Sequence, residues 1–165
     1  MYGINTDKTK AFFIPPQKQV GAWLLEPKDD KTAKKIILYL HGIKGSRGRS
    51  HRVNLYNVLL EQGFKILTID YRGFGDSAKT SVDETTVVQD AKTALDWLRE
   101  KYDENFKIFV WGHSMGTGVA SHAVAKEFLD KDNNTRVDGL ILEAPFTKLT
   151  DEVRSYIAPK MIQVP

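Results

Sequence analysis

Apolar strand-like segments alternate with helix-like segments along this chain. The strand-like segments are short, nearly continuous apolar runs at 20–25, 35–40, 64–69, 108–111 and 137–142. After the second run, apolar residues recur at helical spacing over 53–60, and Gly63 ends that predicted helix. Continuous apolar runs are typical of strands buried on both faces, and helical crossovers pair such strands in parallel. The pattern therefore predicts an α/β protein, with a mostly parallel sheet and helices on both of its faces.

Two more helices follow from the same pattern. Ser81 and Glu84 match a capping box, which predicts a helix from about residue 82 to about residue 102. A helix rich in small residues is expected over 115–128. The charged connection that begins at Pro27 favours a hairpin or a meander between the first two strands. A long flexible connection is expected at 130–136.

The composition suits one globular domain and excludes several classes of function. The chain has 165 residues, with 24 Lys and Arg against 21 Asp and Glu and a net charge of +3. Because these charges are scattered, nucleic acid is not an expected partner. The absence of cysteine removes disulfides, thiolate catalysis and cysteine-based zinc sites. The apolar runs are too short to cross a bilayer, and residues 1–10 lack the apolar centre of a signal peptide, so no membrane anchor is expected within this sequence.

One short motif carries candidate chemistry. The segment Gly112-His113-Ser114-Met115-Gly116 matches G-x-S-x-G, and it stands between a predicted strand and a predicted helix. We expect glycine to be needed at Gly112 and Gly116, because a side-chain Cβ at either position would collide with the adjoining strand or helix. We therefore predict that Ser114 is a nucleophile. The alternative is that its hydroxyl only caps the N-terminus of an ordinary helix.

A serine that attacks a carbonyl also needs N–H donors directed at the oxyanion that forms. The backbone N–H of Met115 is one candidate, because it follows the nucleophile directly. The second donor is expected from the loop after the run at 35–40, and we predict the backbone N–H of Ile43. The alternative is that His41 and Gly42 simply end a strand with a turn.

Several motifs together resemble the α/β-hydrolase superfamily, and within it the lipases of lysophosphatidylserine and monoacylglycerol. They are LHG at 40–42, SRG at 46–48, HR at 51–52, LY at 55–56, DYRGFGDS at 70–77, WGHSMGTGVA at 111–120 and LILEAPFT at 140–147. The resemblance implies an α/β-hydrolase fold and hydrolysis of a lipid acyl ester through an acyl-enzyme on Ser114, without a metal or an organic cofactor. It also implies a location at the lumenal side of the endoplasmic-reticulum membrane, held there by an anchor upstream of this sequence.

The sequence departs from the family pattern at its C-terminal end. In α/β-hydrolases the triad acid and then the histidine follow the nucleophile on later loops. His122 is the only histidine after Ser114, and a helix would place it roughly 12 Å further along its axis, too far to act as the base. We therefore expect residues 1–165 to form the N-terminal part of a single domain, without the last strands and the triad acid and base. Glu143 then has a structural role by resemblance.

Other features allow two interpretations each. Arg47, Arg49 and Arg52 can bind an anionic head group, or they can fix their loop to nearby carboxylates. The G-x-G-x-x-A pattern at 73–78 mimics a dinucleotide fingerprint, but no helix is expected to start inside it. Asp70, beside Arg72, can be a catalytic carboxylate or part of a structural ion pair, and the ion pair is expected because no later histidine is available as its partner.

The leading hypothesis is a serine hydrolase that cleaves acyl esters of lysophospholipids or monoacylglycerols through an acyl-enzyme on Ser114 and that is inactive or weak as this chain alone. A second hypothesis is a non-catalytic fragment of the same fold that binds lipid or a protein partner through an exposed sheet edge. A third is a peptidase or small-ester hydrolase, because acyl transfer uses the same parts. Membrane association is expected only of a longer form that carries the anchor.

Overall fold

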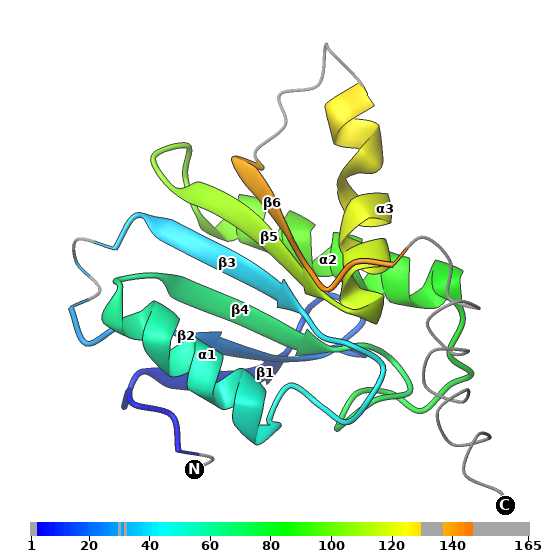
Figure 1. Ribbon diagram of the computed structural model, residues 1–165, viewed down its shortest axis with the longest axis horizontal. Coiled ribbons are helices and arrows are strands. Elements are labelled where there is room, and N and C mark those ends of the chain that lie inside the picture. The colour runs from blue at the N-terminus through cyan, green and yellow to red at the C-terminus, as the bar shows by residue number, and fades with distance from the viewer. Residues whose placement is uncertain (1–2, 30, 32, 130–136, 147–165) are drawn as a thin grey trace, which may run out of the picture.

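A computed structural model describes residues 3–29, 31, 33–129 and 137–146. In these residues one six-stranded sheet, ordered β1-β2-β4-β3-β5-β6, carries three helices (Figure 1). The elements in chain order are β1 (Thr9–Phe13), β2 (Gly21–Leu25), β3 (Lys35–Leu40), α1 (Ser50–Glu61), β4 (Lys65–Asp70), α2 (Glu84–Lys101), β5 (Lys107–His113), α3 (Met115–Leu129) and β6 (Gly139–Glu143). The predicted connection at 130–136 lies outside the described residues. No helix in the described ranges combines the length and the apolarity needed to cross a bilayer.

The middle of the sheet is parallel and buried on both faces. β3 pairs in parallel with β4 and β5, and β5 pairs in parallel with β6. Along β3, Ile36 and Leu38 pack on the side of α2 and α3, whereas Ile37 packs on the side of α1. Helices therefore cover both faces, as Figure 1 shows. The predicted α/β class with a mostly parallel sheet is confirmed.

The predicted hairpin or meander between the first two apolar runs is wrong. β2 pairs antiparallel with β4, so that Gly21 lies opposite Asp70, and β4 separates β2 from β3. The crossover through α1 brings β4 back into this position. β1, which the apolar pattern did not reveal, pairs antiparallel with β2 at the edge. Its sequence is TKAFF and none of its residues is fully buried, so it lacks the apolar run of an inner strand.

The start of α2 also differs from the prediction. α2 begins at Glu84, and its N-cap is Asp83, whose side chain accepts a hydrogen bond of 2.7 Å from the backbone N–H of Thr86. Asp83 lies three residues before Thr86, the spacing at which a capping carboxylate reaches an unpaired N–H. Ser81 lies outside the helix, so the predicted capping box does not form. By contrast, α1 ends as expected, with Gly63 at φ 78° and its N–H bonded to the Leu60 carbonyl.

The N-cap gives a direct test of where α2 begins. Replacing Asp83 by Ala (Asp83→Ala) should lower the melting temperature, because it leaves the Thr86 N–H without its acceptor. Ser81→Ala, the matched control, should leave the melting temperature unchanged. Thermal unfolding followed by circular dichroism measures both. A larger loss in Ser81→Ala than in Asp83→Ala would contradict the observed helix start.

Candidate active site

Ser114 occupies a sharp bend between the end of β5 and the start of α3. Its φ is 52°, in the left-handed region that residues with a Cβ rarely adopt. The Ser114 N–H donates to the Glu143 carbonyl at 2.9 Å, and the N–H and hydroxyl of Thr117 donate to the Ser114 carbonyl at 2.8 and 2.7 Å. The side chain is half-buried. β6 and α3 therefore hold this strained backbone in place, with the serine at the carboxyl end of a parallel strand.

The glycines on either side allow the bend to form. A Cβ on Gly116 would collide with the carbonyl oxygen of Leu40 in β3. A Cβ on Gly112 would collide with the carbonyl oxygen of Gly116 and lie 2.7 Å from the Cα of Thr117. In both cases the obstacle is backbone, which cannot rotate away as a side chain can. The steric reason predicted from the sequence for these two glycines is confirmed.

Two glycine substitutions within α3 distinguish the effect of a steric clash with backbone from the effect of helix propensity. Gly116→Ala should lower the free energy of unfolding by about 3 kcal/mol or more, because the new methyl group meets backbone. Gly118→Ala should raise it by up to about 1 kcal/mol, because the nearest atom, Phe146 Cζ, lies 4.0 Å away and Ala favours helix. Urea unfolding measures both variants. Equal stability of the two would contradict the tight bend.

The loop after β3 packs directly against the bend. A Cβ on Gly42 would lie 3.1 Å from the Cβ of Ser114 and 3.2 Å from the carbonyl oxygen of His113. Ile43 follows, with its side chain 52% exposed. Met115 is the first residue of α3, where a backbone N–H has no acceptor within the helix. The structure thus brings the Gly42–Ile43 peptide and the first turn of α3 together beside Ser114.

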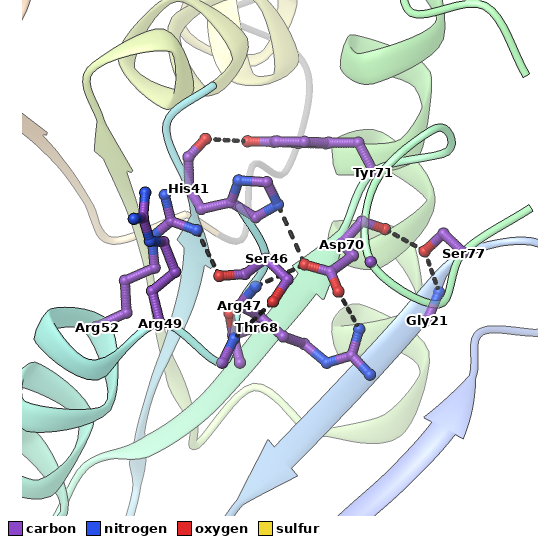
Figure 2. Close-up of polar contacts among 12 residues, drawn as sticks. Gly21, His41, Ser46, Arg47, Arg49, Arg52, Thr68, Asp70, Tyr71 and Ser77 are labelled. Atoms are coloured by element: carbon purple, nitrogen blue, oxygen red, sulfur yellow. Dashed lines mark hydrogen bonds and ion pairs between the residues drawn. The ribbon is translucent and has the colours of Figure 1, made fainter. Parts of the chain in front are cut away.

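Arg52 lies beneath this loop rather than on the surface. Its side chain is buried, and its guanidinium donates to the carbonyl oxygens of Gly42 at 3.3 Å, Lys44 at 2.8 Å and Ser46 at 2.5 Å. Figure 2 shows the Arg52 side chain extending from α1 toward Ser46. Burial lowers the pKa of Arg52. Main-chain acceptors of one loop therefore surround a buried cation.

Arg47 joins the loop after β3 to the loop after β4. Its guanidinium and its backbone N–H each donate to the Asp70 carboxylate at 2.6 Å (Figure 2). The guanidinium also donates to both carboxylate oxygens of Asp76 at 2.7 Å. It also lies 4.8 Å from the centre of the Trp23 ring. Burial alone would lower the pKa of Arg47, but the hydrogen bonds and charges of Asp76 and Asp70 outweigh it and raise that pKa.

These contacts correct part of the predicted head-group site. Arg47 and Arg52 are only 3% and 2% exposed, and both guanidinium groups are bonded within the fold. They therefore do not face an external ligand, and only Arg49 is exposed. The alternative interpretation, that arginines fix the loop to nearby carboxylates, is confirmed for Arg47. Arg52 binds carbonyl groups instead, which neither interpretation predicted.

Asp70 has the structural role expected of it, with partners that the sequence did not indicate. It pairs with Arg47, and its Oδ1 lies 3.3 Å from Nε2 of His41. Arg72 pairs instead with Asp90 of α2 at 2.6 Å. The glycine-rich loop at 73–78 serves the same cluster, because a Cβ on Gly75 would collide with the Asp70 carboxylate. α2 starts only at Glu84, so this loop does not form a dinucleotide fingerprint.

The histidines and Glu143 take part in local contacts. Nδ1 of His41 lies 2.8 Å from the Gly42 carbonyl oxygen, and its ring packs 4.6 Å from the ring of Tyr71, so His41 stabilises its own loop. His122 is paired with Glu84 of α2 at 2.8 Å. Glu143 accepts a hydrogen bond of 3.0 Å from the Trp111 ring nitrogen. None of these contacts assigns a general base to Ser114.

The Asp76 contact makes stability depend on pH. Hydrogen bonds from Arg47 hold the pKa of Asp76 below its usual range. A carboxyl group with a lowered folded-state pKa stabilises the fold above its unfolded pKa, near 3.9, and that contribution is lost as the pH falls through the folded value. Asp76→Asn should therefore cost roughly 1 kcal/mol at pH 7, after screening of a half-exposed pair.

Urea unfolding across the pH range tests this expectation. The stability gap between the wild type and Asp76→Asn should shrink as the pH falls below about 5. Asp96→Asn, which removes an exposed partner of Arg99 on α2, is the control and should change stability by less than about 0.5 kcal/mol at pH 7. A gap for Asp76→Asn that widens toward low pH would contradict the assigned sign.

A glycine-flanked serine at a strand–turn–helix bend, above a mostly parallel sheet, defines the class of α/β-hydrolases. The chain matches the family described as serine aminopeptidase, S33, over residues 31–164, and it belongs to that family. It is 37% identical over 172 aligned positions to lysophosphatidylserine lipase ABHD12 of Xenopus tropicalis. This alignment covers 93% of this chain and 43% of that protein. The corresponding protein of Macaca fascicularis is 45% identical over 121 positions, covering 73% of this chain and 29% of that protein.

A solved structure supports the fold. A soluble variant of monoglyceride lipase from Saccharomyces cerevisiae, in complex with a substrate analogue, superposes with a TM-score of 0.74 at 20% identity, covering 98% of this chain and 52% of that one. The chain therefore spans about half of this structure and less than half the length of the curated relatives it matches. The resemblance to the α/β-hydrolases and to their lipases is confirmed, and the fold with it.

Proposed function

We propose that Ser114 is the nucleophile of a serine hydrolase that cleaves the acyl ester of a lysophospholipid or a monoacylglycerol. The observation that carries this proposal is the φ of 52° at Ser114, held between β5 and α3 by glycines that allow no Cβ. Strain of this kind persists only where the surrounding structure imposes it, and it concentrates at functional sites. The choice of a lipid ester is supported by the relatives described as lysophosphatidylserine lipases.

The proposed reaction passes through an acyl-enzyme. The Ser114 hydroxyl oxygen forms a bond to the ester carbonyl carbon while its proton passes to a general base. The carbonyl oxygen becomes an oxyanion that accepts hydrogen bonds from the backbone N–H groups of Met115 and Ile43. The C–O bond to the glycerol moiety then breaks, and the alcohol leaves with a proton. Water attacks the acyl-enzyme and releases the fatty acid.

The general base is the part of this scheme that the described residues do not provide. In the family order, the acid and the histidine follow the nucleophile, whereas no histidine follows His122 in this sequence. We therefore propose that this chain by itself reacts slowly, through the nucleophile and the oxyanion donors alone. Arg49, exposed on the loop after β3, is the remaining candidate for contact with an anionic head group. The absence of a cofactor and the location at the endoplasmic-reticulum membrane stay predictions from the resemblance.

Covalent labelling tests the role of Ser114. A fluorophosphonate should label the wild type at one serine, and Ser114→Ala should abolish that labelling because the attacking oxygen is gone. Ser81→Ala, an exposed serine outside the bend, is the control and should be labelled like the wild type. In-gel fluorescence and mass spectrometry of the modified peptide measure the result. Equal labelling of Ser114→Ala and the wild type would remove Ser114 from this role.

A substrate panel separates the hydrolase from its alternatives. Release of fatty acid from monoacylglycerol or lysophosphatidylserine vesicles, lost in Ser114→Ala, supports the lipase. Cleavage confined to an aminoacyl amide or a short-chain ester would favour a peptidase or a small-ester hydrolase instead. Binding to the vesicles without labelling or hydrolysis would favour the non-catalytic fragment.

A further inference from the structure

The carbonyl group of Gly42 is held by two side chains at once. Nδ1 of His41 lies 2.8 Å from its oxygen, and Nη2 of Arg52 donates to the same oxygen at 3.3 Å. Both side chains are buried. A carbonyl oxygen bound from two fixed side chains has little freedom to rotate, so the orientation of the Gly42–Ile43 peptide is set within the fold.

This orientation determines where the next N–H group points. The Gly42 C=O and the Ile43 N–H belong to one planar peptide unit, and the only cis peptide bond in the described residues joins Pro15 and Pro16. In a trans peptide the C=O and the N–H point in opposite directions. Drawing the Gly42 oxygen toward Arg52 and His41 therefore turns the Ile43 N–H away from them. Gly42 itself packs against Ser114, so this N–H is presented beside the bend.

Arg52 binds further carbonyl groups of this loop besides that of Gly42. Its guanidinium also binds the carbonyl oxygens of Lys44 and Ser46, and Gly45, at φ 74°, allows the chain to curve around it. A planar guanidinium can serve acceptors in several directions, whereas the compact ammonium of lysine cannot reach all of them from the same backbone position. The loop that carries Ile43 is thus shaped around one buried side chain of α1.

We infer that Arg52 is a positioning residue of the oxyanion hole. Through the Gly42 carbonyl it fixes the Ile43 N–H in the direction from which that N–H donates to the carbonyl oxygen of an ester attacked by Ser114. Arg52 does not touch the ester itself. The inference rests on the proposed function of Ser114 and explains why a buried cation lies beneath a loop of carbonyl groups rather than beside a carboxylate.

Fluorophosphonate labelling rates test this role with a matched control. Arg52→Met removes all three carbonyl contacts and should slow labelling of Ser114 by about 100-fold, the usual effect of losing one oxyanion donor. Arg52→Lys keeps the charge and should restore only part of the rate. The control is Lys65→Met, which also removes a buried cation, paired with Glu26 at 2.7 Å. Lys65 opens β4, at the opposite end of the parallel strands from Ser114, so this variant should keep the wild-type rate even at a similar loss of melting temperature.

A second measurement gives a result even where labelling is too slow to follow. The N–H residual dipolar coupling of Ile43 reports the direction of that bond relative to the sheet. It should change in Arg52→Met, stay unchanged in Lys65→Met, and leave the couplings of β3 and β5 unaffected in both variants.

The outcomes separate this inference from the proposed function. An unchanged Ile43 coupling, or a wild-type labelling rate, in Arg52→Met would overturn the positioning role of Arg52. Equal slowing in Lys65→Met would also overturn it, because the effect would then follow stability alone. Labelling that persists in Ser114→Ala would instead overturn the proposed function.

Discussion

The ion pair between Arg47 and Asp70 is the constraint on which the site depends. Both side chains are nearly inaccessible to solvent, with relative exposures of 4% and 2%. Removing one partner of a buried pair leaves an uncompensated charge and typically costs about 3–5 kcal/mol. The pair joins the loop after β3, which packs against Ser114 through Gly42, to the last residue of β4. The position of this loop relative to β4 therefore depends on both charges.

Close backbone contacts transmit this position to Ser114, the proposed nucleophile. Gly116 in the first turn of α3 packs against the Leu40 carbonyl oxygen at the end of β3, and Gly42 packs against Ser114. Because these contacts are made close to the main chain, a movement of the loop after β3 would also move the backbone that packs against Ser114. The charged cluster and the strained bend are in this sense one unit, although they come from different loops.

The sequence predicted the parts of the fold that depend on burial. The apolar run at 35–40 coincides with β3, and the run at 108–111 lies inside β5. β1 was missed because its charged, half-exposed sequence gives no such signal, and the hairpin was wrong because pairing depends on where α1 returns the chain. The motif around Ser114 predicted the bend because steric contacts leave glycine as the only choice there.

The roles of the arginines were harder to predict, because charge alone does not show which way a side chain points. Arg52 nevertheless carries a signal: it stands four residues before Tyr56 and eight before Leu60, on the buried face of α1. A cation at such a position needs internal acceptors. Every buried backbone oxygen likewise needs a donor. Arg52 meets both requirements, since its guanidinium donates to the carbonyl oxygens of Gly42, Lys44 and Ser46 in the loop that carries Ile43, the proposed second oxyanion donor.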